Sequence, residues 1–264
     1  MPDLAKLPTL PAHPFGSGEM ASGYATARPA VHPRVVEQVV AQLGRREPFS
    51  RALDVGCGAG LSTRALGPFA RQCIGVDPAE AMVKWASATT LSAQFAVGAA
   101  EAIPLCGGSV DLVTAAGSLN YANLDLFFPE ASRVLMPGGV LVIYDFSPGR
   151  HFRNATGLDE WFSNFIARYP PPRDEARTLD PAILADLHSG FRMNSHRYFE
   201  IGLTLTPDFY LDYMMTETNV AAAVNSGVPR PEIRSWCAET LAPIWRGVDR
   251  EVLFHGYFAC LTPA

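Results

Sequence analysis

The sequence lacks the long apolar runs of a membrane protein. No stretch approaches the ~20 consecutive apolar residues that a transmembrane helix needs, and the first residues lack the basic and apolar regions of a secretory signal. It also lacks a basic excess, because 21 Lys and Arg residues stand against 26 Asp and Glu residues. Without a basic stripe, binding to nucleic acid is not expected. We therefore expect a cytoplasmic protein whose partner is neither a membrane nor a nucleic acid.

Cysteine is scarce and scattered. The five cysteines form no CxxC pair, and the histidines have no spacing typical of a metal site. This pattern predicts reduced thiols, without disulfide bonds and without a bound metal ion. Of the 264 residues, 48% are hydrophobic, which is enough for a single globular domain with a sizeable core.

Short apolar segments alternate with helical patterns in the first half of the chain. An amphipathic helix is expected first, at residues 31–43. Strands are then expected at residues 52–56, 72–78, 92–98, 110–119 and 140–146, with helices at residues 61–70, 78–89 and 124–135 and a turn at residues 137–139. This order predicts an α/β fold with a parallel sheet covered by helices on both faces. Ligands of such sheets bind at the carboxyl ends of the strands.

The pattern divides the single domain into four parts. Residues 1–45 form a tail and the first helix, residues 46–146 the ligand-binding core, and residues 147–195 a lid insertion. Residues 196–264 form the rest of the core sheet and its helices. This last part has expected helices at residues 208–224 and 230–245 and a last strand near residues 251–261. The insertion is rich in aromatic residues, which either cover a ligand or bury their own helix against the sheet. Core packing suits each residue taken singly, and we favour a lid for the segment as a whole.

The stretch LDVGCGAG, residues 53–60, places three glycines at every second position between a predicted strand and a predicted helix. Such a turn forms a nucleotide site, because glycines allow a close backbone approach and free amides point outward. The spacing differs from the G-x-G-x-x-G of dinucleotide-binding folds, and no Gly-Lys-Ser/Thr follows as in a P-loop. Asp77, at the end of the next predicted strand, has a carboxylate that can accept hydrogen bonds from two hydroxyl groups.

In these residues the chain resembles the class I S-adenosylmethionine-dependent methyltransferases. LDVGCGAG is similar to the first motif of that family and IGVDP to the second, and GAAEAIPLCGGSVDLV and SRVLMPGGVLVIYDF are similar to the segments that follow. The four motifs occur in the order of the family. SGYATARPAVHP also resembles the Y-x-x-x-R-P-x-x-P segment of a small-molecule branch that includes relatives of trans-aconitate methyltransferase.

The resemblance implies a Rossmann-like sheet of seven strands with the last one antiparallel, S-adenosyl-L-methionine as cofactor and S-adenosyl-L-homocysteine as product. It implies that Asp77 holds the ribose hydroxyls and that Arg28 contacts the cofactor carboxylate, although a surface arginine before a proline is the alternative. The full set of expected cofactor-binding residues is Tyr24, Arg28, Asp54, Gly56, Cys57, Gly58, Gly60, Asp77, Pro78, Met82, Ala100, Glu101 and Gly117. The chain departs from the family at Ala99, where many relatives have an acidic residue, and at Asn120 and Tyr121, where relatives often have His-Trp.

The predicted strand ends supply the candidates for catalysis. Methyl transfer is an in-line displacement, so the acceptor, the methyl group and sulfur must be aligned and water excluded. Asn120 and Tyr121 are placed to orient an acceptor, and Tyr144 and Asp145 lie at the end of the next strand. His151 follows and is either a general base or a solvated loop side chain.

We expect a methyltransferase of the EC 2.1.1 type that acts on a small, partly apolar molecule. An intermediate of specialised metabolism is the expected acceptor, with oxygen favoured over nitrogen or carbon. The alternatives are a nicotinamide-dependent oxidoreductase and a non-catalytic protein that binds the cofactor as a partner or sensor. The glycine spacing opposes the first, and nothing in the sequence excludes the second. Monomer and homodimer both stay open.

Overall fold

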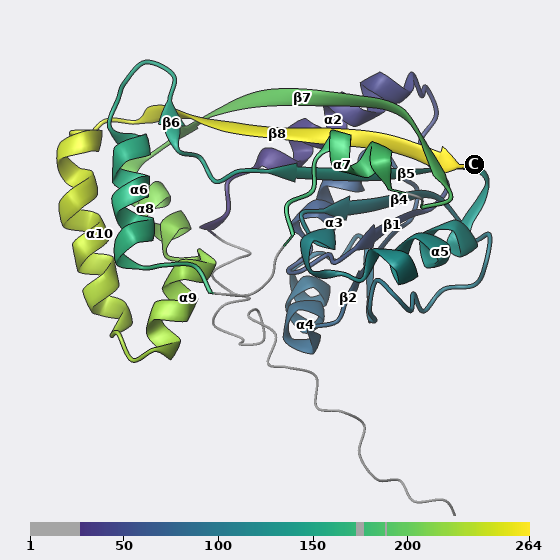
Figure 1. Ribbon diagram of the computed structural model, residues 1–264, viewed down its shortest axis with the longest axis horizontal. Coiled ribbons are helices and arrows are strands. Elements are labelled where there is room, and N and C mark those ends of the chain that lie inside the picture. The colour runs from purple at the N-terminus through teal and green to yellow at the C-terminus, as the bar shows by residue number, and fades with distance from the viewer. Residues whose placement is uncertain (1–26, 173–176, 188) are drawn as a thin grey trace, which may run out of the picture.

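One mixed sheet of eight strands is the centre of the computed structural model, which describes residues 27–172, 177–187 and 189–264 (Figure 1). The strands are β1 (Ala52–Val55), β2 (Cys73–Asp77), β3 (Gln94–Val97), β4 (Val110–Ala116), β5 (Leu135–Phe146), β6 (His151–Phe152), β7 (Phe191–Leu205) and β8 (Arg250–Pro263). The helices are α2 (Val31–Leu43), α3 (Leu61–Leu66), α4 (Glu80–Thr89), α5 (Leu124–Val134), α6 (Leu158–Arg168), α7 (Pro181–Asp186), α8 (Pro207–Met214), α9 (Thr218–Asn225) and α10 (Arg230–Trp245).

The first five strands run parallel in the order β3-β2-β1-β4-β5. β8 lies between β5 and β7 and runs antiparallel to both, and the two-residue β6 pairs with β8 beyond the end of β5. All four residues of β1 are buried, as is typical of a central parallel strand with helices on both faces. The predicted α/β fold with an antiparallel last strand is therefore confirmed.

Alternate residues of β5 enter two separate cores on opposite faces of the sheet. Val140, Val142 and Tyr144 belong to the core that α2 covers. Leu141 and Ile143 belong to the core that α5 covers. This alternation is the two-residue period of a strand, and a strand that is buried on both faces shows no polar side in its sequence.

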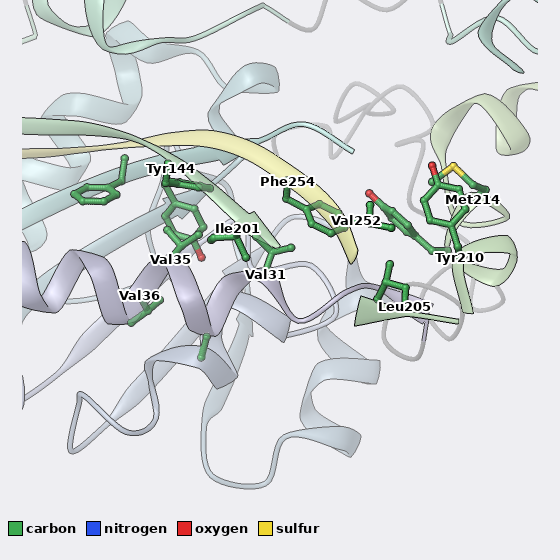
Figure 2. Packing of buried hydrophobic residues seen from close by; sticks show 14 of the residues in the cluster. Val31, Val35, Val36, Tyr144, Ile201, Leu205, Tyr210, Met214, Val252 and Phe254 are labelled. Carbon is green, nitrogen blue, oxygen red and sulfur yellow. The ribbon is translucent and has the colours of Figure 1, made fainter. Parts of the chain in front are cut away.

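Helix α2 forms over the residues that its apolar spacing predicts. Val31, Val35, Val36 and Val39 are buried along one side of the helix. Figure 2 shows Val35 of α2 and Tyr144 of β5 pointing toward one another. The valine side of α2 is therefore the part of the helix that holds it on the sheet.

Helices α6, α8, α9 and α10 gather at one end of the molecule, where β5 leads into β6 and α6 (Figure 1). Aromatic rings fill the space between them. Trp161 stacks on Phe165 with ring centroids 5.3 Å apart, and its Nε1 donates a hydrogen bond to Thr240 Oγ1 at 2.8 Å. Phe162 and Tyr169 are also buried. These aromatic residues of the insertion therefore form a core between the helices, as expected for each residue taken singly.

Two strands extend beyond their predicted limits. β5 includes the turn predicted at residues 137–139, because a register shift in its pairing with β4 accommodates the extra residues. β7 begins at Phe191, so the end of the range expected for the lid, residues 147–195, belongs to the sheet. Its pairing with β8 joins segments that are far apart in the sequence, and local patterns do not report such pairing.

A break divides the helix predicted at residues 208–224 into α8 and α9. Thr216 Oγ1 donates a hydrogen bond to the carbonyl of Tyr213 at 2.7 Å, and Glu217 has an extended backbone ahead of α9. Threonine side chains compete with the helix for backbone carbonyls in this way, which favours a helix end. The connection carries residues of the candidate site described below.

A hydrogen bond joins the start of α2 to β5. His32 Nδ1 and the hydroxyl oxygen of Tyr144 lie 2.9 Å apart. Burial lowers the pKa of His32 from 6.5 to about 4, and the positive charge of Arg28 adds to this effect. His32 is therefore neutral at pH 7, and its protonation works against the folded state.

We expect acid to destabilise the fold through His32. The unfolded chain takes up the imidazole proton near pH 6.5 and the folded chain only near pH 4, so the free energy of unfolding falls as the pH drops through this window. The contribution of this residue should be on the order of 1–3 kcal/mol at the acid end. Urea unfolding of the wild type and of His32→Gln across the window measures it. Identical pH dependence in the two proteins would exclude His32 as the cause.

Candidate functional site

The loop between β1 and α3 holds the three glycines of the LDVGCGAG motif. Gly56, Gly58 and Gly60 have φ angles of 70°, 51° and 87°, which favour glycine. Gly56 also approaches the segment after β4 so closely that an added Cβ would overlap the side chain of Ser118. Ser118 Oγ donates a hydrogen bond to the carbonyl of Val55 at 2.7 Å. The ends of β1 and β4 therefore meet at Gly56.

Asp54 lies beneath this loop and is completely buried. Its Oδ2 accepts hydrogen bonds from Ser62 Oγ at 2.6 Å and Thr63 Oγ1 at 2.7 Å, and its Oδ1 accepts one from Thr114 Oγ1 at 2.9 Å. Burial raises the pKa of the Asp54 carboxyl, and the hydroxyl donors oppose this effect. Asp54, expected as a cofactor contact, is thus placed where it joins β1 to α3 and β4 from inside the protein.

Asp77 ends β2 beside the glycine loop and is buried. Its Oδ2 accepts a hydrogen bond from the backbone N–H of Gly58 at 2.9 Å, and its Oδ1 accepts one from the N–H of Ala79 at 2.8 Å. One carboxylate thus joins the loop to the start of α4. Apart from Gly58 and its two chain neighbours, no described residue has an atom within 4 Å of the position that a Cβ would take at Gly58. The loop is therefore open on this side.

Asn120, expected to orient an acceptor, contacts the end of β5. Its Nδ2 donates a hydrogen bond to Asp145 Oδ2 at 3.0 Å, and Asp145 Oδ1 accepts one from the N–H of Phe146 at 2.8 Å. Burial raises the pKa of the Asp145 carboxyl. Gly117 lies against the same carboxylate, and a Cβ added there would be 2.9 Å from Asp145 Oδ1. The ends of β4 and β5 thus share one polar group.

Arg28 connects the segment before α2 to the helices at the other side of the site. Its Nη1 lies 3.1 Å from Glu217 Oε1, and its Nη2 donates a hydrogen bond to the carbonyl of Thr216 at 3.2 Å. The guanidinium carbon lies 5.1 Å from the ring centre of Tyr213. With a side chain that is only 17% exposed, Arg28 is not the surface arginine of the alternative interpretation. Together with Leu61 at the start of α3 it lines a cavity of about 230 Å³.

The loop after β3 is tied to the start of α5. Glu101 Oε1 accepts a hydrogen bond from the N–H of Asn123 at 2.6 Å. Ala100 precedes it and is half-buried. The two residues expected to border the cofactor therefore lie in a loop whose position α5 helps to determine.

Four further residues complete the expected cofactor set. Cys57 is buried within the glycine loop, and Met82 is buried on α4. Pro78 is exposed at the turn after β2. Tyr24 lies outside the residues that the structure describes.

The two other catalytic candidates are exposed. Tyr121 is 51% exposed in the turn after β4. His151 is exposed on β6, and its ring centre lies 6.0 Å from that of His255. His255 Nε2 lies 3.2 Å from Glu200 Oε2. Within the described part of the chain, no hydrogen bond joins His151 to Asn120, so the structure does not bring these predicted residues into one group.

Hydroxyl side chains are the part of the site that the sequence does not predict. Ser62, Thr63 and Thr114 all donate to Asp54, and Ser118 reaches back to β1. A signal exists for the first two, since they lie in the first turn of α3, two and three residues after Gly60. Thr114 lies 60 residues after Asp54 and has no local signal.

Neither a metal-binding cluster nor a membrane-spanning helix occurs within residues 27–172, 177–187 and 189–264. No three His, Cys, Asp or Glu side chains in these ranges are arranged to hold a metal ion. None of the helices there is long and apolar enough to cross a membrane. All five cysteines carry free thiols.

The fold and the glycine loop define a Rossmann-like α/β protein, and known proteins make the class more specific. A family model for a methyltransferase domain matches residues 53–143. A Dictyostelium discoideum protein named as a methyltransferase is 29% identical over 238 residues, which is 88% of this chain and 87% of that protein. The ubiquinone biosynthesis O-methyltransferase of Agrobacterium fabrum is 29% identical over 66% of this chain and 74% of its own length.

A solved structure gives the same result. A protein of Anaeromyxobacter dehalogenans, described as a type II methyltransferase, is 26% identical with a TM-score of 0.65. The match covers 85% of this chain and 94% of that one. These matches support a class I S-adenosylmethionine-dependent methyltransferase.

We expect alanine substitutions at Gly56 and Gly58 to have unequal costs. Each places a Cβ on a left-handed residue, which costs about 1–2 kcal/mol. At Gly56 the Cβ also overlaps Ser118, so Gly56→Ala should lower the free energy of unfolding by roughly 3 kcal/mol or more. Gly58→Ala should lower it only by the cost of the left-handed backbone. Urea unfolding without ligand compares them. Equal losses would contradict the close approach of the loop to Ser118.

Proposed function

We propose that this chain is an enzyme that binds S-adenosyl-L-methionine at the carboxyl ends of β1, β2 and β4 and methylates a small, partly apolar molecule in the cytoplasm. The acceptor is an intermediate of specialised metabolism, and the cofactor product is S-adenosyl-L-homocysteine. Oxygen is the favoured acceptor atom over nitrogen and carbon. The similarity to a ubiquinone biosynthesis O-methyltransferase supports oxygen.

The observation that carries the proposal is the buried carboxylate of Asp77 beside the open side of the glycine loop. Asp77 accepts hydrogen bonds from the backbone at Gly58 and Ala79, which holds the carboxylate in place. A carboxylate oxygen can accept more than one hydrogen bond, so these contacts are compatible with two ribose hydroxyl groups. No side chain occupies the space over Gly58 in the described part of the chain. The residues present therefore fit a nucleoside.

When bound, S-adenosyl-L-methionine supplies a methyl group on a positively charged sulfur. The protein residues bind and orient. Asp77 would hold the ribose, Arg28 the carboxylate end of the cofactor, and Asn120 the acceptor. The helical layer of α6, α8, α9 and α10 would limit the access of water, and alignment of this kind can contribute roughly 7–11 kcal/mol to lowering the barrier.

The charges at the strand ends favour this cofactor over a nicotinamide dinucleotide. Asp77 and Asp145 place carboxylates there, and Asp145 forms no ion pair with a cationic side chain among the described residues. A carboxylate attracts a sulfonium and repels a pyrophosphate.

We expect Asp77→Asn to weaken binding of S-adenosyl-L-homocysteine at least about tenfold, because hydrogen bonds from hydroxyl groups to a charged acceptor are the stronger kind. Titration calorimetry with S-adenosyl-L-homocysteine and with NADH measures it. Asp111→Asn is the matched control, since Asp111 is equally buried and accepts two backbone hydrogen bonds, from Ser50 and Arg51, at the opposite ends of β1 and β4. Unchanged affinity in Asp77→Asn would remove this residue from the site, and binding of NADH alone would overturn the proposal.

Transfer itself is expected with isotope-labelled S-adenosyl-L-methionine against a panel of phenols, carboxylic acids and amines. Phenols or carboxylic acids should be labelled more than amines, since oxygen is the proposed acceptor atom. The labelled product is counted after extraction, and heat-denatured protein is the control. Tight binding of S-adenosyl-L-homocysteine without transfer to any panel member or to a cell extract would favour a non-catalytic binding protein.

A further inference from the structure

The carboxylate of Asp145 is half-buried and has no positive partner. Its two hydrogen-bond donors are neutral, the amide of Asn120 and the N–H of Phe146. No Lys, Arg or His of the described residues forms an ion pair with it, whereas Asp111, at the opposite ends of the strands, lies 3.4 Å from Arg45. A carboxylate in such surroundings is costly unless a positive charge approaches it.

The position of Asp145 connects it to the glycine loop. Gly117 lies against its Oδ1, and the next residue, Ser118, contacts Gly56 of the loop. A larger residue than glycine at position 117 would have to displace the carboxylate, because its Cβ would lie 2.9 Å from Oδ1. Two consecutive residues after β4 therefore make the contact with Asp145 and the contact with the loop.

The other side of Asp145 faces segments outside the parallel core. Asp145 pairs with Tyr257 of β8, so their side chains lie on the same face of the sheet. The carbonyl of Asn120 accepts a hydrogen bond from the N–H of Arg177 at 3.0 Å, which brings the segment ahead of α7 to the same place. Asp145 thus lies between the glycine loop and the part of the chain expected to cover the acceptor.

We propose that the Asp145 carboxylate faces the sulfonium of S-adenosyl-L-methionine and supplies its counter-charge, with Asn120 as the residue that positions it. The inference rests on the proposed function, since it assigns a role at that same site. Its consequence is selectivity. S-adenosyl-L-homocysteine has lost the positive charge, so Asp145 favours the methyl donor over the spent product and assists their exchange.

The test compares the affinities of S-adenosyl-L-methionine and S-adenosyl-L-homocysteine by titration calorimetry in the wild type, in Asp145→Asn and in the control Asp111→Asn. Loss of one nearby charge should weaken binding of the methyl donor about five- to twentyfold and leave the product almost unchanged. The dissociation constant of S-adenosyl-L-methionine divided by that of S-adenosyl-L-homocysteine should therefore rise in Asp145→Asn and in neither of the other two proteins. An unchanged ratio, or equal weakening of both ligands, overturns the role of Asp145 and leaves the proposed function standing.

A measurement on the wild type keeps the test decisive if Asp145→Asn does not fold. The same ratio should rise as the pH falls and Asp145 becomes protonated, because a neutral carboxyl group offers no counter-charge. The other titratable groups beside it are Tyr144 on its own strand and Tyr257 on β8, and burial raises the pKa of both, so they stay neutral. A ratio independent of pH overturns the inference, and binding of neither ligand removes the proposed function and this inference with it.

Discussion

The buried carboxylate of Asp54 is the interaction on which the site depends. It holds the hydroxyl groups of Ser62, Thr63 and Thr114, which come from α3 and from β4. A carboxylate without such donors would be expensive to bury, so these three contacts have to form together when the strands pair. They fix where α3 begins relative to β1, and hence the shape of the glycine loop between them. The contact of Gly56 with Ser118 and the position of Asp77 follow from that shape.

Charge is distributed unevenly around the site. The strand ends carry the carboxylates of Asp77 and Asp145, which accept hydrogen bonds from neutral amide groups. The cation of Arg28 comes from the segment ahead of α2 and is held by Glu217 of the helical layer. The segment ahead of α2 therefore links the sheet to the helices at one end of the molecule. A ligand with a positive centre and a carboxylate end matches this arrangement, because each of its charges meets the opposite sign.

Much of the fold can be predicted from the sequence because its signals are local. The valines of α2 recur at helical spacing, and the glycine turn marks where β1 ends and α3 begins. The order of strands and helices then requires a parallel sheet with its ligand site at the carboxyl ends. The candidate site can be predicted from the sequence in the same way, where its residues are marked by local signals. Asp77 ends its strand as expected. The sequence does not indicate that the Asp54 side chain points into the protein, since β1 is apolar around it and buried on both faces.

What the sequence by itself determined is the resemblance to the methyltransferases, the glycine loop and the set of strand ends at which a ligand would bind, because these depend on residues close together in the chain. What only the tertiary structure decided is which distant residues meet there. Asn120 joins Asp145, and Arg28 joins Glu217 across 189 positions, while His151, predicted beside them, lies on the surface near His255. Such contacts arise from strand pairing and helix packing over long sequence separations, and no local spacing encodes them.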